Sequence, residues 1–96
     1  MRRAAKVDRN QSEIVDALRK AGATVYPMHS VGQGFPDLCV GYRGLNLLME
    51  VKDGNLSPSG QRLTERQRQF RESWFGHYVV VTSVGEALEA LGVKSV

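Results

Sequence analysis

The sequence predicts an α/β fold, a single mixed β-sheet flanked by helices, with its elements in the order α-β-β-β-α-β-α. Its 96 residues suffice for one domain, which we expect to span residues 1–96. Three segments repeat apolar residues at helical spacing, and β-prone segments lie between them. Strands and helices interleaved in this way pack most economically as one sheet with helices on its faces.

The first helix is expected over residues 8–21. Asp8 or Asn10 can act as its N-cap, because a short polar side chain accepts a hydrogen bond from the first free N–H groups. Gly22 follows, and glycine readily adopts the left-handed conformation that ends a helix. The apolar face of this helix comprises Ile14, Val15, Leu18 and Ala21.

Three β-prone segments follow the helix. Residues 24–29 form the first, and Pro27 within it indicates an edge strand or a strand end. Residues 37–42 and 45–52 form the other two, joined by a tight turn at residues 43–44 into a predicted hairpin. The second strand of this hairpin is apolar on both faces, which is typical of a strand at the centre of a sheet.

The second half of the chain is expected to form a loop, a helix, a strand and a last helix. Gly, Ser, Pro and Asn mark the loop over residues 53–61, and the helix spans about residues 64–74. A Val-rich strand at residues 78–82 leads to Ser-x-x-Glu at residues 83–86. This pattern is a capping box that opens the last helix, which Gly92 ends.

Basic residues gather in two parts of a chain whose net charge, +3, is only mildly positive. Clusters of this kind suit the phosphate backbone of a nucleic acid. A solvated helix face with ordinary salt bridges gives the same pattern, so charge alone leaves both interpretations open. The clustered residues are Arg2, Arg3, Lys6 and Arg9 at the start, then Arg62, Arg66, Arg68 and Arg71.

Cysteine usage and hydropathy favour a cytoplasmic protein. Cys39 is the only cysteine, so no intramolecular disulfide can form, and this fits a reducing compartment. No apolar run approaches the roughly 20 residues of a membrane span. The N-terminal residues lack the apolar stretch of a signal peptide. We therefore expect no membrane partner.

The predicted hairpin brings two carboxylates together. Counting back from the turn places residue 42 near residue 45, and Asp37 near Glu50. Two acids facing each other across strands repel, and a divalent cation is a natural compensation. Lys52 shares a face with Glu50, because side chains alternate along a strand. Such a site suits a magnesium-dependent phosphodiesterase, although solvated charges at a strand end are the alternative interpretation.

Four short motifs carry a resemblance to a known family. Pro-Asp at residues 36–37, a spacer of 12 residues and Glu-x-Lys at residues 50–52 form the signature of the PD-(D/E)-x-K nuclease superfamily. Gly-Phe-Pro-Asp-Leu at residues 34–38 and Thr-x-x-Gln at residues 64–67 make the chain resemble the virus-type replication-repair nuclease (VRR-NUC) domain, of the small stand-alone phage and bacterial type. The likeness covers nearly the whole chain and implies a restriction-endonuclease-like core.

The resemblance implies a metal site with named ligands. Asp37 and Glu50 would bind Mg²⁺ or Mn²⁺, and the Val51 carbonyl would supply a further oxygen. Glu13 matches the family's helical acid and would reach the metal through water or bind a second ion. A surface acid that pairs with Arg9 or Lys20 is the alternative for Glu13.

The resemblance also assigns residues around the metal. Lys52 would orient the attacking water or stabilise charge on the phosphate. Gln67 matches the family's glutamine beside the site, although Thr64 and Gln67 equally fit a helix capping box. The basic residues we consider for DNA binding are Arg62, Arg66, Arg9 and Lys6.

The expected function is a metal-dependent, structure-selective DNA endonuclease that leaves a 5′-phosphate and a 3′-hydroxyl. Stand-alone members of the family resemble Holliday-junction resolvases, so we expect a homodimer whose two-fold axis matches a four-way junction. Trp74 and Phe75 close the second helix and are expected to be core or dimer contacts, not a base-stacking platform. The alternatives are a nicking or flap nuclease of phage replication or repair, a catalytically idle DNA-binding module, and a plain α/β interaction domain.

Overall fold

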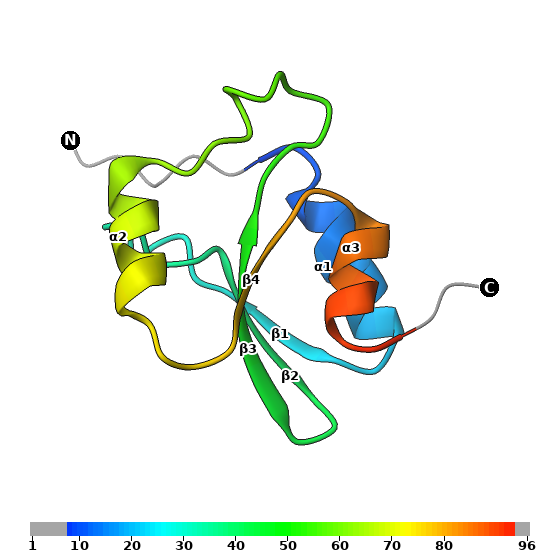
Figure 1. Cartoon of the computed structure of the whole chain (residues 1–96). Helices are drawn as coiled ribbons and strands as arrows, with labels where there is room; N and C mark the ends of the chain where they lie inside the picture. Colours follow the sequence, from blue (N-terminus) through cyan, green and yellow to red (C-terminus); the bar gives the residue numbers. More distant parts are fainter. Residues whose placement is uncertain (1–7, 94–96) are drawn as a thin grey trace.

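A computed structural model describes residues 8–93 as one four-stranded mixed sheet with three helices (Figure 1). The α-β-β-β-α-β-α order predicted from the sequence is confirmed. Within these residues, no helix has the length and apolar character needed to cross a membrane. The elements are α1 (Gln11–Lys20), β1 (Thr24–Pro27), β2 (Leu38–Tyr42), β3 (Leu45–Val51), α2 (Glu65–Ser73), β4 (Tyr78–Val81) and α3 (Val84–Ala90).

The strands follow one another across the sheet in the order β1-β2-β3-β4. The first three are antiparallel neighbours, whereas β4 pairs with β3 in parallel. Tyr42 pairs with Leu45, which confirms the predicted hairpin. Arg43 and Gly44 have φ angles of 48° and 83° in its two-residue turn, and this left-handed backbone matches the natural twist of the strands. Pro27 ends edge strand β1, as expected.

The two faces of the sheet carry different layers. Helices α1 and α3 lie together on one face, and α2 lies on the other (Figure 1). The hydrophobic core fills the first layer, where buried residues of α1 and α3 pack against alternate residues of β3 and β4. Met49 and Val51 point into this core. Glu50 therefore points to the opposite face, toward the layer that contains α2.

Helix α2 is held by polar caps more than by a buried face, because none of its residues is buried. The Thr64 side chain accepts a hydrogen bond from the Gln67 N–H, and the Gln67 side chain accepts one from the Thr64 N–H. This is the reciprocal capping box that the sequence predicts. It fixes the first turn of α2, and with it the position of Gln67.

The loop before β2 packs against the backbone of α2. Gly34 has a φ of +83°, and a Cβ atom built on it would lie 2.4 Å from the Arg66 carbonyl oxygen. Only glycine allows this approach without displacing one of the two segments. Beside this contact, the rings of Phe35 and Phe70 meet edge to face with centroids 5.2 Å apart. The loop that leads into Asp37 and the helix that carries Gln67 thus position each other.

The start of α1 differs from the prediction in a way that matters for the site. The helix begins at Gln11, so Asp8 lies before it, and Asn10 occupies the N-cap position without making a side-chain cap. The Asn10 amide instead donates to the carbonyl oxygens of Lys52 and Thr82, at 3.1 and 3.0 Å. These bonds tie the start of α1 to the ends of β3 and β4.

We expect Gly34→Ala to destabilise the protein far more than Gly32→Ala. Both glycines have positive φ angles, but a Cβ on Gly32 would meet nothing within 4 Å. The control should lose only about 1 kcal/mol of unfolding free energy, the cost of a left-handed alanine. Gly34→Ala should lose about 3 kcal/mol, because the clash with α2 adds to that cost. Urea denaturation of both variants measures the difference, and equal losses would show that the close approach has no energetic weight.

Candidate active site

The register of the hairpin places the two predicted acids across from each other. Leu38 pairs with Met49, so the preceding residue, Asp37, lies opposite Glu50. The Asp37 carboxylate accepts a hydrogen bond from the Val51 N–H at 2.7 Å. Glu50 is 2% exposed. The pairing expected from the turn count is confirmed, and it occurs at a buried end of the sheet.

Pro36 explains why the Val51 carbonyl faces this site. The Lys52 N–H donates to the Val81 carbonyl of β4, so the backbone groups of Val51 point the other way, toward β2. Extending the hairpin register by two residues places Pro36 opposite Val51. Proline has no N–H and cannot donate to that carbonyl. The Pro-Asp sequence therefore leaves a backbone oxygen beside the two carboxylates, where the resemblance expects a metal ligand.

Gln67 links the acidic pair to the predicted lysine. Its Nε2 donates to Glu50 Oε2 at 3.0 Å, and its Oε1 accepts from Lys52 Nζ at 2.7 Å. Lys52 Nζ lies 3.9 Å from Glu50 Oε2. The same Oε1 also accepts the N–H of Thr64, so Gln67 caps α2 and orders the site at once. The two alternatives for Gln67, a site residue and a capping residue, are both present in the structure.

Burial and neighbouring charge hold Glu50 in its protonated form. The pKa of this carboxyl is raised from 4.5 to about 9, first by burial, then by the charge of Asp37 and a hydrogen bond with it. Lys52 opposes the increase, and Asp8 adds to it.

The donor set fits a divalent cation. Glu50 Oε1 is buried and lacks a hydrogen-bond donor among the described residues. Within residues 8–93, no three His, Cys, Asp or Glu side chains are grouped to hold a metal ion, so Asp37 and Glu50 would be two carboxylate ligands without a third. Mg²⁺ commonly binds through one or two carboxylates and completes its shell with water and substrate phosphate. The Val51 carbonyl would add a third protein oxygen.

Asp8, which sequence reasoning treated only as a helix cap, acts on this site. Its negative charge contributes to the raised pKa of Glu50, which places the carboxylate within electrostatic reach. No sequence motif marks Asp8. Its position depends on where α1 begins and on the bonds of Asn10 to the ends of β3 and β4.

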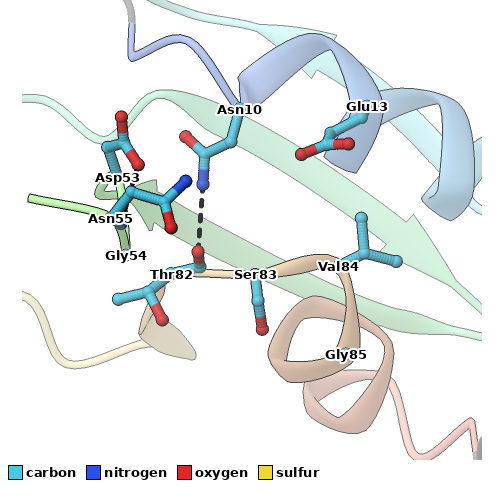
Figure 2. A pocket seen from close by; sticks show the side chains of 9 residues that line it. All are labelled: Asn10, Glu13, Asp53, Gly54, Asn55, Thr82, Ser83, Val84 and Gly85. Carbon is cyan, nitrogen blue, oxygen red and sulfur yellow. Dashed lines mark hydrogen bonds between the residues drawn. The ribbon is translucent and has the colours of Figure 1, made fainter.

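Glu13, the predicted helical acid, lies elsewhere. It is exposed on α1 and lines a pocket of about 520 Å³ with Asp53 and Ser83 (Figure 2). Asp53 is two residues beyond Val51 on the core side of the sheet, whereas Glu50 faces the α2 side. The pKa of Asp53 is lowered by a hydrogen bond from the Asn55 N–H and by Arg9. The structure does not bring Glu13 together with Asp37 and Glu50.

The predicted basic residues occupy three different settings. Arg9 forms an ion pair with Asp53 at 3.2 Å while most of its side chain stays exposed. Arg62 and Arg66 are exposed at the start of α2. Lys6 lies outside the described residues.

Tyr78 is a further residue at the site that the sequence did not indicate. It begins β4 opposite Leu48, on the same face of the sheet as Glu50. Burial and the charge of Glu50 raise the pKa of its hydroxyl to about 12, whereas the charge of Arg71 lowers it. Tyr78 therefore lies near the acidic pair, and Arg71 lies near Tyr78. A tyrosine in a Val-rich strand gives no signal of this role without the parallel β3–β4 register.

Comparison with known proteins does not assign this chain. A scan against models of protein families, a search of curated proteins and a search of solved structures each found no match. The chemistry of the site therefore follows from its own geometry.

We expect the unfolding free energy of the metal-free protein to fall as pH rises through neutrality. Between pH 4.5 and about 9, folded Glu50 keeps a proton that the unfolded chain has lost, so rising pH favours unfolding. The contribution of one such proton approaches about 1.4 kcal/mol per pH unit. Urea denaturation in EDTA at pH 6, 7 and 8 should show this slope in the wild type and a flatter one in Glu50→Gln. Parallel slopes would contradict the protonated assignment.

Proposed function

We propose that this protein is a metal-dependent DNA endonuclease that uses Mg²⁺ or Mn²⁺. The observation that carries the proposal is that Asp37, Glu50 and Lys52 lie together at the end of the β2–β3 hairpin away from its turn, joined by Gln67 from a separate helix. Two acids and an ammonium brought together in a largely buried setting are costly for a fold. A site that cleaves phosphodiesters is one that needs two acids and an ammonium side by side.

Asp37, Glu50 and the Val51 carbonyl would hold the cation. When bound, it would lower the pKa of a water ligand and stabilise charge on the phosphate. The chain contributes the geometry. The Val51 N–H fixes one Asp37 oxygen, Gln67 fixes one Glu50 oxygen, and Glu50 Oε1 is buried without a hydrogen-bond partner among the described residues. Binding of the cation would displace the proton that Glu50 holds in the apo protein.

Lys52 would act on the phosphate or on the attacking water. Its ammonium is largely buried, and Gln67 Oε1 holds it within 3.9 Å of Glu50 Oε2. A buried cation at a fixed position stabilises the added negative charge of a pentavalent phosphorus better than a solvated lysine does. Gln67 is the positioning residue, because it touches both Lys52 and Glu50.

The substrate and assembly extend the same proposal. DNA is the expected polymer because α2, the helix that contributes Gln67 to the site, carries the exposed arginines Arg66 and Arg71. We include a homodimer acting on a four-way junction, since one small domain carries one site and two symmetric cuts need two. The cytoplasm of a bacterial or phage-infected cell is the proposed setting, and the free thiol of Cys39 agrees with it.

Cleavage assays test the activity directly. The protein should cut end-labelled four-way junctions in Mg²⁺ or Mn²⁺, and EDTA should abolish cutting. Lys52→Ala should lower the rate by at least about 100-fold while junction binding persists. Paired symmetric cuts in the junction alone would support a resolvase, and cuts in every substrate would indicate a general nuclease. Junction binding without any cleavage in either metal would overturn the enzymatic proposal in favour of an idle DNA-binding module.

The affinity for Mn²⁺ should depend on Asp8 and not on Glu13. We expect Asp8→Asn to weaken Mn²⁺ binding about tenfold, because it removes a negative charge that acts on Glu50. Glu13→Gln is the matched control and should change the affinity less than about twofold, because its carboxylate lies in the Asp53 pocket. Titration calorimetry measures both. If both variants lost the same amount of Mn²⁺ affinity, Glu13 would have to be counted as part of the metal site.

A further inference from the structure

The outer end of α2 exposes aromatic surface. Phe75 is 99% exposed and Trp74 is 41% exposed. Of the two settings expected for them, core or dimer contact, the core is therefore wrong, and the dimer contact stays a prediction. An isolated exposed aromatic needs no explanation, but here two lie in succession and Trp74 stacks on Phe70 at 5.3 Å, continuing an aromatic cluster. We call Trp74 and Phe75 the aromatic end.

Helix α2 connects the aromatic end to the candidate active site. Gln67, in its first turn, touches Glu50 and Lys52. Arg71 lies one turn further along, and its charge acts on the Tyr78 hydroxyl, which also feels the charge of Glu50. The aromatic end directly follows Ser73, the last residue of α2. A strand that runs along α2 toward the site would therefore meet the exposed rings first and Arg71 next.

The charges of α2 favour a polyanion beside these rings. Arg68 is neutralised by ion pairs with Glu65 and Glu72. The other arginines of this segment are exposed, and no ion pair is seen for them within residues 8–93. These are Arg62, Arg66 and Arg71.

We propose that the aromatic end binds unpaired bases of the DNA strand that is cut. Bases would stack on Phe75 and on the exposed edge of Trp74, while Arg71 contacts the backbone between them and the scissile phosphate. Exposed rings next to a cationic track are the usual design of single-strand binding surfaces, because every base offers a π-face. The inference rests on the proposed nuclease function and narrows its substrate to DNA with unpaired bases beside the cut.

A second copy of the chain is a less favourable binding partner for the aromatic end than DNA is. In a two-fold interface the same patch meets itself. Packing the aromatic ends of two copies against each other would bring Arg71 and its exposed neighbours toward their own equivalents. Like charges brought together in this way oppose association, whereas the same charges favour a phosphate backbone.

Trp74 provides the test, because it is the only tryptophan in the chain. Its fluorescence is titrated with oligothymidine and with blunt duplex of equal length, using wild-type protein in EDTA so that no metal-dependent cleavage occurs. We expect quenching and tighter binding with the single strand. Phe75→Ala in the same background should bind oligothymidine about 5- to 150-fold more weakly. Tyr26→Ala is the matched control, since Tyr26 is also exposed, at 66%, but lies on β1.

The outcomes separate this inference from the nuclease proposal. Single-strand affinity that falls only in Phe75→Ala supports base stacking, whether or not the wild type cuts DNA. Equal affinity for oligothymidine and duplex, or an unchanged Phe75→Ala, overturns it even if the wild type is an active nuclease. Light scattering of both variants examines the rival occupant. Dissociation of a dimer in Phe75→Ala, with single-strand affinity unchanged, would assign the aromatic end to self-association.

Discussion

The site depends on one buried carboxylate on the central strand of the sheet. Glu50 is almost fully buried opposite Asp37, with one oxygen held by Gln67 and the other without a donor. A buried negative charge in this position is unfavourable. In the metal-free protein, burial and the nearby acid raise the pKa of Glu50, so that Glu50 keeps a proton. A divalent cation would act differently, by neutralising both acids at once. The proposed metal binding and the expected pH dependence of stability thus have the same physical origin.

Helix α2 is attached to the fold largely through the site that it serves. It buries none of its residues, so apolar burial alone contributes little to holding it in place. What holds it are the capping box at Thr64, the bonds of Gln67 to Glu50 and Lys52, and the close approach of Gly34. Any change in the protonation or metal state of Glu50 acts directly on Gln67. The position of α2 and the protonation state of the acids are therefore coupled.

The sequence predicts features that depend on local rules and misses those that depend on how layers cover the sheet. Counting from the two-residue turn was enough to place Asp37 opposite Glu50, because hairpin register is local. Apolar spacing on α2 indicated a buried side, yet Trp74 is exposed, because spacing cannot show that one short helix lies alone on its face of the sheet. Glu13 fits the helical-acid pattern, but it is exposed on α1 and lines a pocket with Asp53, whereas Asp8, before the helix, is the acid whose charge acts on Glu50.

Side chains alternate between the two faces of β3, and this lets one strand contribute to the hydrophobic core on one face and to the candidate site on the other. Met49 and Val51 face the core, while Glu50 and Lys52 face α2, so successive residues of one strand serve different purposes. A shift of the hairpin by one residue would put the acids into the core and the apolar side chains into the site. Because such a shift would cost a large free energy, the hairpin keeps its register. It also makes the strand that stabilises the fold a rigid base for Glu50 and Lys52, whereas α2, which buries none of its residues, is the element freest to adapt to the proposed substrate.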